Sequence, residues 1–157
     1  MKKDIFIDNN IACRFSNPMD PNMIELVSWL MDNRGDHSNH AFLAVSKKLL
    51  EEYLSTCRGG GNASSTSMPM IVDRLGREGR LSFISKKKID RFKEMYYTKR
   101  VVNHFLSNAE DREHIPVVLL SDRKFALTKD RNFAADLMRF PGFSPVVSGR
   151  PEDIPYK

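Results

Sequence analysis

The segment at residues 124–135, KFALTKDRNFAA, changes its hydrophobic period near its middle. Apolar residues alternate up to Thr128, as in a strand, whereas Phe133 and Leu137 have the spacing of one helix face. Asp130 therefore lies where a strand ends and a helix begins. Its carboxylate can cap the helix through the free N–H groups of the first turn. It can also be one of several acids at the carboxyl ends of parallel strands, where open α/β sheets place their ligands.

The rest of the chain repeats this alternation of strand and helix patterns. Short apolar runs predict further strands at residues 4–8, 40–45, 81–84 and 145–148, and helical patterns occur at residues 23–31, 47–57, 70–75 and 99–106. No hairpin signal joins the strands, which favours a parallel sheet wrapped by helices. A length of 157 residues suits one domain. We therefore predict a single α/β domain over residues 1–157, with three α/β/α layers around a central, mostly parallel sheet of four to five strands.

Two of the predicted helices have recognisable caps and apolar faces. Asp20 precedes the first helix and Ser46 the second, and both are preferred N-cap residues. The apolar stripes are Ile24, Val27, Leu30 and Met31 in the first helix and Leu49, Leu50, Tyr53 and Leu54 in the second. Glu52 flanks the second stripe, so its carboxylate can lie at the edge of a buried site. The alternative is plain solvation, because glutamate is rarely buried without a partner.

The sequence argues against several classes of protein. No apolar run approaches the ~20 residues of a membrane-spanning helix, and Asp4 stands where a signal peptide would continue its apolar core. We therefore expect a cytoplasmic protein that does not enter a membrane. Cys13 and Cys57 form no CxxC pair and are expected to be reduced and without a role. The glycine-rich residues 58–67 match no phosphate-binding loop motif and are predicted to be a mobile loop.

Positive charge is concentrated in one segment. Residues 86–100 contain seven basic residues and two acids, an excess of five that equals the net charge of +5 of the whole chain. Such a run is either a solvated helix face or a surface that contacts phosphates. The candidate contacts with nucleic acid are Lys86, Lys87, Lys88, Arg91, Lys99 and Arg100.

Four acids, taken in chain order, resemble the acidic set of the PIN-domain nucleases. Asp8 ends the first strand, Glu52 lies in the serine-capped helix, and Asp111 lies near a helix start. Asp130 belongs to an ending of the form strand, Thr, any residue, Asp. The nineteen positions from Asp111 to Asp130 are similar to the interval between the third and fourth acids of the family. The resemblance spans residues 4–147.

The resemblance implies a metal-dependent ribonuclease of the toxin type. It implies that the four acids bind Mg²⁺ or Mn²⁺ and that RNA, or another single-stranded nucleic acid, is cleaved to 5′-phosphate and 3′-hydroxyl ends. Carboxylate oxygens are the hard ligands that these ions prefer, and one or two acids per ion leave positions for water and substrate phosphate. A protein antitoxin is an expected partner, since small members of the family resemble the toxins of toxin–antitoxin pairs. The family also forms homodimers.

A second register is open near the end of the chain. Pro116 lies five residues after Asp111, where a helix capped by Asp111 needs its N–H groups. If residues 117–120 are a strand instead, Asp122 ends that strand and becomes the fourth acid. Asp130 is favoured because its helix is followed by a last strand at ordinary loop lengths.

Two other functions stay open beside the nuclease. A PIN-like module without catalysis would bind nucleic acid in a salt-sensitive, metal-independent way, which the basic segment would serve. A metal-dependent phosphatase on a related α/β fold is the least favoured. Asp8 is followed by two asparagines, whereas the haloacid dehalogenase type has a DxD motif.

Overall fold

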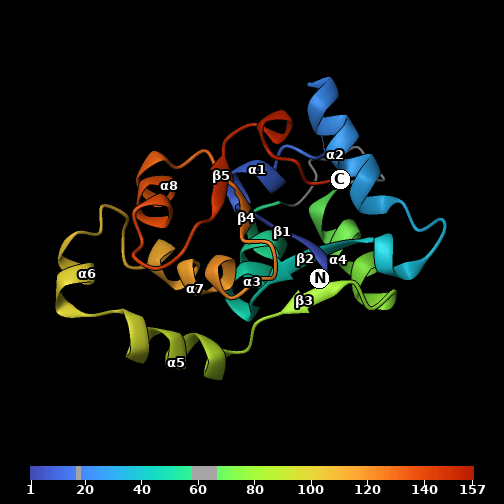
Figure 1. Cartoon of the computed structure of the whole chain (residues 1–157). Coiled ribbons are helices and arrows are strands. Elements are labelled where there is room, and N and C mark those ends of the chain that lie inside the picture. Colours follow the sequence, from blue (N-terminus) through green and yellow to red (C-terminus); the bar gives the residue numbers. More distant parts are fainter. Residues whose placement is uncertain (17–18, 58–66) are drawn as a thin grey trace.

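The protein is built around a parallel sheet. The computed structural model describes residues 1–16, 19–57 and 67–157. Five strands lie in the order β3-β2-β1-β4-β5, and each neighbouring pair is parallel (Figure 1). The strands are β1 (Lys3–Ile7), β2 (Ala41–Val45), β3 (Leu81–Phe83), β4 (Phe125–Leu127) and β5 (Val146–Ser148). The predicted α/β class with a mostly parallel sheet is confirmed.

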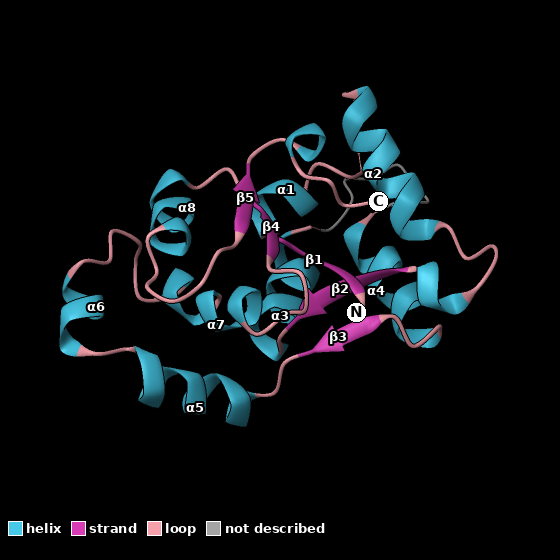
Figure 2. Ribbon diagram, viewed as in Figure 1, coloured by secondary structure: helices cyan, strands magenta, loops and turns pink. Residues whose placement is uncertain are grey.

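Helices fill the connections between the strands. They are α1 (Asn9–Ala12), α2 (Pro21–Met31), α3 (Lys47–Thr56), α4 (Met68–Arg77), α5 (Lys86–Tyr96), α6 (Lys99–Asn103), α7 (Ile115–Leu119) and α8 (Arg131–Met138). With the usual right-handed crossovers, this strand order puts α1 to α4 on one face of the sheet and α5 to α8 on the other. The contacts of α3 with α1 and α4, and of α5 with α7, agree with this arrangement. Figure 2 shows α5 to α8 on the left of the sheet and α2 and α4 on its right. Within the described residues, no helix has the length and apolar character needed to cross a membrane.

The pair formed by β1 and β4 is where the strand order reverses. The chain leaves β1 toward β2 and β3, and it later returns to place β4 and β5 on the other side of β1. Open α/β sheets bind ligands outside the carboxyl ends of the strands at such a switch point. Asp8 directly follows β1, and Asp130 follows β4 after two residues.

The predicted helix caps are confirmed, but two predicted apolar faces are wrong at their margins. Asp20 accepts a hydrogen bond from Asn22 N at 2.9 Å, and Ser46 Oγ accepts one from Leu49 N at 3.2 Å. Two side chains assigned to the core lie in solvent instead, since Ile24 is 50% exposed and Leu54 is 54% exposed.

The exposure of both side chains follows from helix geometry. Ile24 comes directly after the buried Met23, and Leu54 directly after the buried Tyr53. One residue corresponds to a rotation of about 100° around a helix axis, which turns each side chain away from the sheet. The buried stripe of α2 is instead made by Met23, Leu26, Val27 and Leu30.

The two cysteines do not match their prediction. Cys13 and Cys57 form a disulfide, with their Cα atoms 4.5 Å apart, whereas the sequence suggested two reduced and unimportant thiols. The bond joins the residue after α1 to the residue after α3. These residues are 44 positions apart, so no local cysteine motif marks the pair. Residues 58–66 of the predicted mobile loop lie outside the described residues.

Candidate active site

Asp8 is a buried acid at the carboxyl end of β1. The residue is only 8% exposed. Oδ1 accepts a hydrogen bond from Asn9 N at 2.8 Å, and Oδ2 accepts one from Thr128 Oγ1 at 2.6 Å. Asn10 Nδ2 lies 3.4 Å from the same Oδ2. Burial raises the pKa of Asp8, while the hydrogen bonds from Thr128 and Asn9 oppose that rise.

The end of β4 is tied to the end of β1 by polar contacts. Asp8 N donates to Leu127 O at 2.8 Å, which continues the strand pairing by one residue. Thr128 Oγ1 donates to Asp8 and accepts from Asp130 N at 3.1 Å. Lys129 N donates to the side-chain oxygen of Asn10 at 3.1 Å. One threonine hydroxyl therefore sets the separation between two of the four candidate acids.

Asp130 caps a helix and also lies beside a second candidate acid. Its Oδ1 accepts from Asn132 N at 2.9 Å and from Phe133 N at 3.1 Å, so it is the N-cap of α8. Its carboxyl group also shares a hydrogen bond with that of Asp111. Burial raises the pKa of Asp111 to about 6, and the proximity of Asp130 and Asp8 adds to the rise.

Glu52 reaches the same edge of the sheet from α3. Both of its carboxylate oxygens lie 3.0 Å from Nε2 of His114. Its negative charge is also close enough to contribute to the raised pKa of Asp8. The structure therefore brings all four predicted acids, Asp8, Glu52, Asp111 and Asp130, into one electrostatically coupled group.

The alternative register, with Asp122 as the fourth acid, is wrong in its structural premise. The segment predicted as a strand belongs to α7. Pro116 is the second residue of that helix, where a missing N–H costs little. Asp122 accepts a hydrogen bond from Lys2 N at 2.9 Å, and its own N–H donates to Asp4 at 2.7 Å. Asp122 thus lies at the amino end of β1, opposite to the acidic group.

A side-chain contact joins Asp111 to Asp130, while Asp8 interacts with Glu52 and Asp111 through their charges. Among the described residues, no three His, Cys, Asp or Glu side chains are arranged to hold one ion. Mg²⁺, however, is commonly bound through only one or two carboxylates and keeps several waters. Asp111 and Asp130 offer such a pair of oxygen donors, and a cation between them would relieve the mutual repulsion that helps to raise the pKa of Asp111. The chemistry of this pair fits a hard divalent cation.

The predicted basic residues fall into two groups. The first group lies on α5, which starts after β3 at the same edge of the sheet as the acids, and consists of Lys86, Lys87, Lys88 and Arg91. Within this group, Lys86 forms an ion pair with Asp90 at 2.9 Å. Lys99 and Arg100 lie on α6, which extends beyond α5 at the far end of the molecule (Figure 1).

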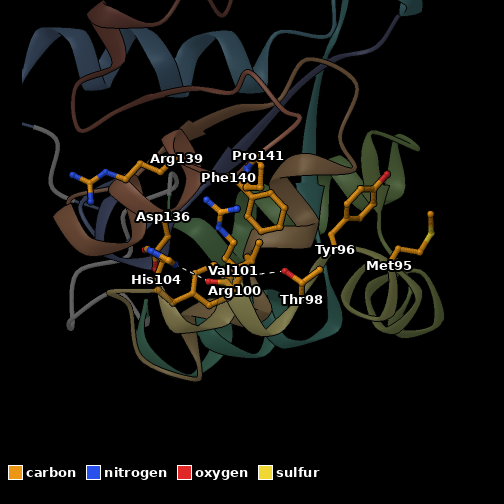
Figure 3. Close-up of a pocket in the computed structure, with 11 residues that line it drawn as sticks. Met95, Tyr96, Thr98, Arg100, Val101, His104, Asp136, Arg139, Phe140 and Pro141 are labelled. Atoms are coloured by element: carbon orange, nitrogen blue, oxygen red, sulfur yellow. Dashed lines mark hydrogen bonds between the residues drawn. The ribbon is translucent and has the colours of Figure 1, made fainter.

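Arg100 also lines a cavity of about 560 Å³ between α6 and the end of α8 (Figure 3). The cavity is largely apolar, with Phe105 and Phe140 in its walls and Arg139 beside them. The acid in its lining, Asp136, is bound by the backbone N–H groups of Leu106 and Ser107, at 2.9 Å each. The acidic group shares no residue with this cavity.

Two polar residues of the site were missed from the sequence. His114 contacts Glu52, which is 62 positions away, and Asn10 joins the ends of β1 and β4. Asn10 comes directly after a predicted strand, where an asparagine favours a turn or helix start and signals no role in a site. The one sequence signal for His114 is its position three residues after Asp111, which places an imidazole beside a candidate acid.

One solved structure supports the fold inferred from the sequence. Neither the protein-family models nor the curated proteins compared with this sequence gave a match. The structure is described as VapBC2 from Rickettsia felis bound to a DNA fragment from its promoter. The similarity has a TM-score of 0.54 at 15% identity, over 94% of this chain and 98% of that chain. At this identity the likeness shows the fold alone, a parallel sheet covered by helices.

Proposed function

We propose that this protein is a divalent-metal-dependent ribonuclease of the PIN type, acting in the cytoplasm as the toxin of a toxin–antitoxin pair. The observation that carries the proposal is the meeting of Asp8, Glu52, Asp111 and Asp130 beside the switch point of the sheet. These acids come from four separate segments. Burying or crowding carboxylates lowers the stability of the fold, so such a group more often marks a functional site than a structural one.

The residues of the site have distinct roles in this proposal. When bound, Mg²⁺ or Mn²⁺ supplies a more acidic water for in-line attack and positive charge beside the leaving oxygen. Asp8 provides a carboxylate held in one orientation by Thr128 and Asn9. Asp111 and Asp130 would provide two adjacent carboxylates to hold the cation. Glu52 completes the set from α3.

The basic helix α5 supports RNA as the substrate. Its first turn lies at the carboxyl edge of the sheet, so Lys87 and Lys88 can bind the phosphates that flank a scissile bond. The similar solved structure is a VapBC2 assembly on DNA, which supports a protein antitoxin as partner. We include a homodimer in the proposal because the resembling family forms them.

RNA cleavage by wild type and single variants tests the function. Asp8→Asn and Asp130→Asn keep the size of the side chain but remove its charge, and we expect each to abolish Mg²⁺- or Mn²⁺-dependent cleavage of mixed RNA. Asp122→Asn makes the same change at the opposite edge of the sheet and should leave activity intact. Cleavage that survives both Asp8→Asn and Asp130→Asn would refute the assignment.

The second candidate function is a binding module without catalysis. It is favoured by the finding that no three His, Cys, Asp or Glu side chains of the described residues are arranged to hold one ion. A silent module would bind RNA equally well in chelator and would show no metal-linked rise in melting temperature. A nuclease would show that rise, and Asp111→Asn should reduce it.

A further inference from the structure

His114 makes a buried contact with one of the four acids. The residue is 2% exposed and precedes the first residue of α7. Its Nε2 lies 3.0 Å from both carboxylate oxygens of Glu52 on α3. The ring also packs against Phe6 of β1, with centroids 5.9 Å apart and planes at 50°. The position of the imidazole is therefore fixed by three separate elements.

The other ring nitrogen identifies the atom that carries the proton. Nδ1 of His114 is buried and has no hydrogen-bond partner among the described residues. A proton on Nδ1 would be an unsatisfied buried donor, whereas an unprotonated Nδ1 leaves only an acceptor unused. A proton on Nε2 instead points at the Glu52 carboxylate. The favoured tautomer is thus the one that donates to Glu52.

We propose that His114 is a positioning residue that fixes the carboxylate of Glu52 by donating its Nε2 proton. Glu52 has a side chain that is 29% exposed, and a glutamate on a helix surface otherwise has several accessible rotamers. Groups that orient metal-binding side chains in this way typically contribute 10- to 100-fold to metal affinity or activity. The inference rests on the proposed function only in assigning Glu52 to the metal site.

Two substitutions separate positioning from packing. His114→Gln retains an amide N–H that can reach Glu52 as Nε2 does, whereas the shorter side chain of His114→Asn ends nearer to the place of Nδ1. The readout is the Mn²⁺ concentration that gives half of the metal-linked rise in melting temperature. We expect roughly a 10- to 100-fold higher midpoint for Asn, and a midpoint near that of wild type for Gln. Equal midpoints for Asn, Gln and wild type would overturn the proposal.

A second measurement needs neither metal nor activity. Long-range ¹H–¹⁵N spectra of the imidazole in metal-free protein should show the proton of His114 on Nε2. Glu52→Gln should shift the Nε2 signal, and the distant Asp122→Asn should not. A proton on Nδ1, or an Nε2 signal indifferent to Glu52→Gln, would overturn the positioning role. If wild type gives no metal response at all, the proposed function fails, and these spectra still decide the role of His114.

Discussion

Thr128 connects two candidate metal ligands through a single hydroxyl group. The oxygen donates to Asp8 at 2.6 Å and accepts from the backbone N–H of Asp130 at 3.1 Å, and the residue is 3% exposed. A buried carboxylate depends on such donors because burial removes the water molecules that would otherwise hydrogen-bond to it. Thr128 therefore contributes both to the stability of the fold and to the spacing of the acids.

Replacing the hydroxyl of Thr128 tests this dependence. Thr128→Val keeps the shape but leaves Asp8 without its shortest hydrogen bond, and we expect a loss of about 1–3 kcal/mol in the free energy of unfolding at pH 7. Thr128→Ser keeps the hydroxyl and loses one methyl group, which costs about 1 kcal/mol. Urea unfolding of the three proteins measures both effects. A Val variant that is as stable as wild type would contradict this role.

Asp111 should make the free protein less stable as the pH rises. Its pKa in the folded protein is raised from the ordinary 3.8 to about 6, so between these values the folded state binds more protons than the unfolded state. Stability from this group is therefore complete below pH 4 and is lost as the pH passes 6. Above pH 6, ionised Asp111 repels Asp130 and Asp8.

Asp111→Asn should consequently stabilise the metal-free protein at high pH. In chelator at pH 8 we expect the melting temperature to rise by roughly 2–4 °C, the response of a domain of this size to about 1 kcal/mol. At pH 4.5 the gain should shrink, because wild-type Asp111 is then protonated as well. Asp122→Asn is the matched control and should show no such dependence. A lower melting temperature for Asp111→Asn at pH 8 would argue against repulsion between Asp111 and the neighbouring acids.

At the scale of single residues, the sequence identified the acids better than their supports. Asp8 and Asp130 follow predicted strands, Asp111 lies near a helix start, and Glu52 flanks an apolar helix stripe. Their order along the chain resembles the acidic set of the PIN-domain nucleases, and the structure brings them together. His114 was missed because its partner is 62 positions away, and only the fold brings the two together.

At the scale of secondary structure, α5 is the element that the proposed function requires to bind RNA. Lys87 and Arg91 lie one turn apart on this helix and line the same surface hollow. For single strands, each lost phosphate contact reduces the slope of log affinity against log salt by about 0.7. The double variant Lys87→Gln/Arg91→Gln should therefore bind RNA more weakly and reduce the slope by roughly 1.4.

A matched pair of cations provides the control for α5. Arg34 and Arg77 lie at the amino side of the sheet, before β2 and at the end of α4. Arg34→Gln/Arg77→Gln removes the same amount of charge and should leave the salt slope unchanged. Equal effects of the two double variants in fluorescence anisotropy would show that total charge, and not α5, determines binding.

The disulfide is the element-scale contact with the largest expected effect on stability. It joins α1 to the end of α3 across 44 positions. Closing a loop of that length lowers the entropy of the unfolded chain, which corresponds to about 4 kcal/mol. The guanidinium concentration at the midpoint of unfolding should therefore be clearly higher for the oxidised protein than for the protein in reductant. Cys13→Ser/Cys57→Ser should unfold like the reduced form and ignore reductant. Identical midpoints for oxidised and reduced wild type would contradict the bridge.

Errors in the predicted elements have local causes. Residues 117–120 were open to a strand assignment because four consecutive apolar residues satisfy both periods, and burial on all sides of α7 hides the helical one. The caps at Asp20, Ser46 and Asp130 were predictable since they depend only on residues within three positions.

At the scale of the whole molecule, the class of fold follows from the sequence but the strand order does not. Alternating strand and helix patterns imply parallel pairing, because each crossover returns the chain to the same end of the sheet. The position of β4 beside β1 depends on strand pairing between residues about 120 positions apart, such as Ile7 and Leu127. No local pattern records such a neighbour.

The central place of β1 has a consequence for the order in which the protein is made. Asp8 precedes Thr128, which holds it in place, by 120 positions. At synthesis rates of roughly 5–20 residues per second, about 6–24 s separate their appearance. Until residue 125 is added, the nascent chain contains β1 but neither β4 nor Asp130. Under the proposed function, the nascent chain therefore cannot cleave the RNA of the ribosome that is making it until most of the chain has been translated.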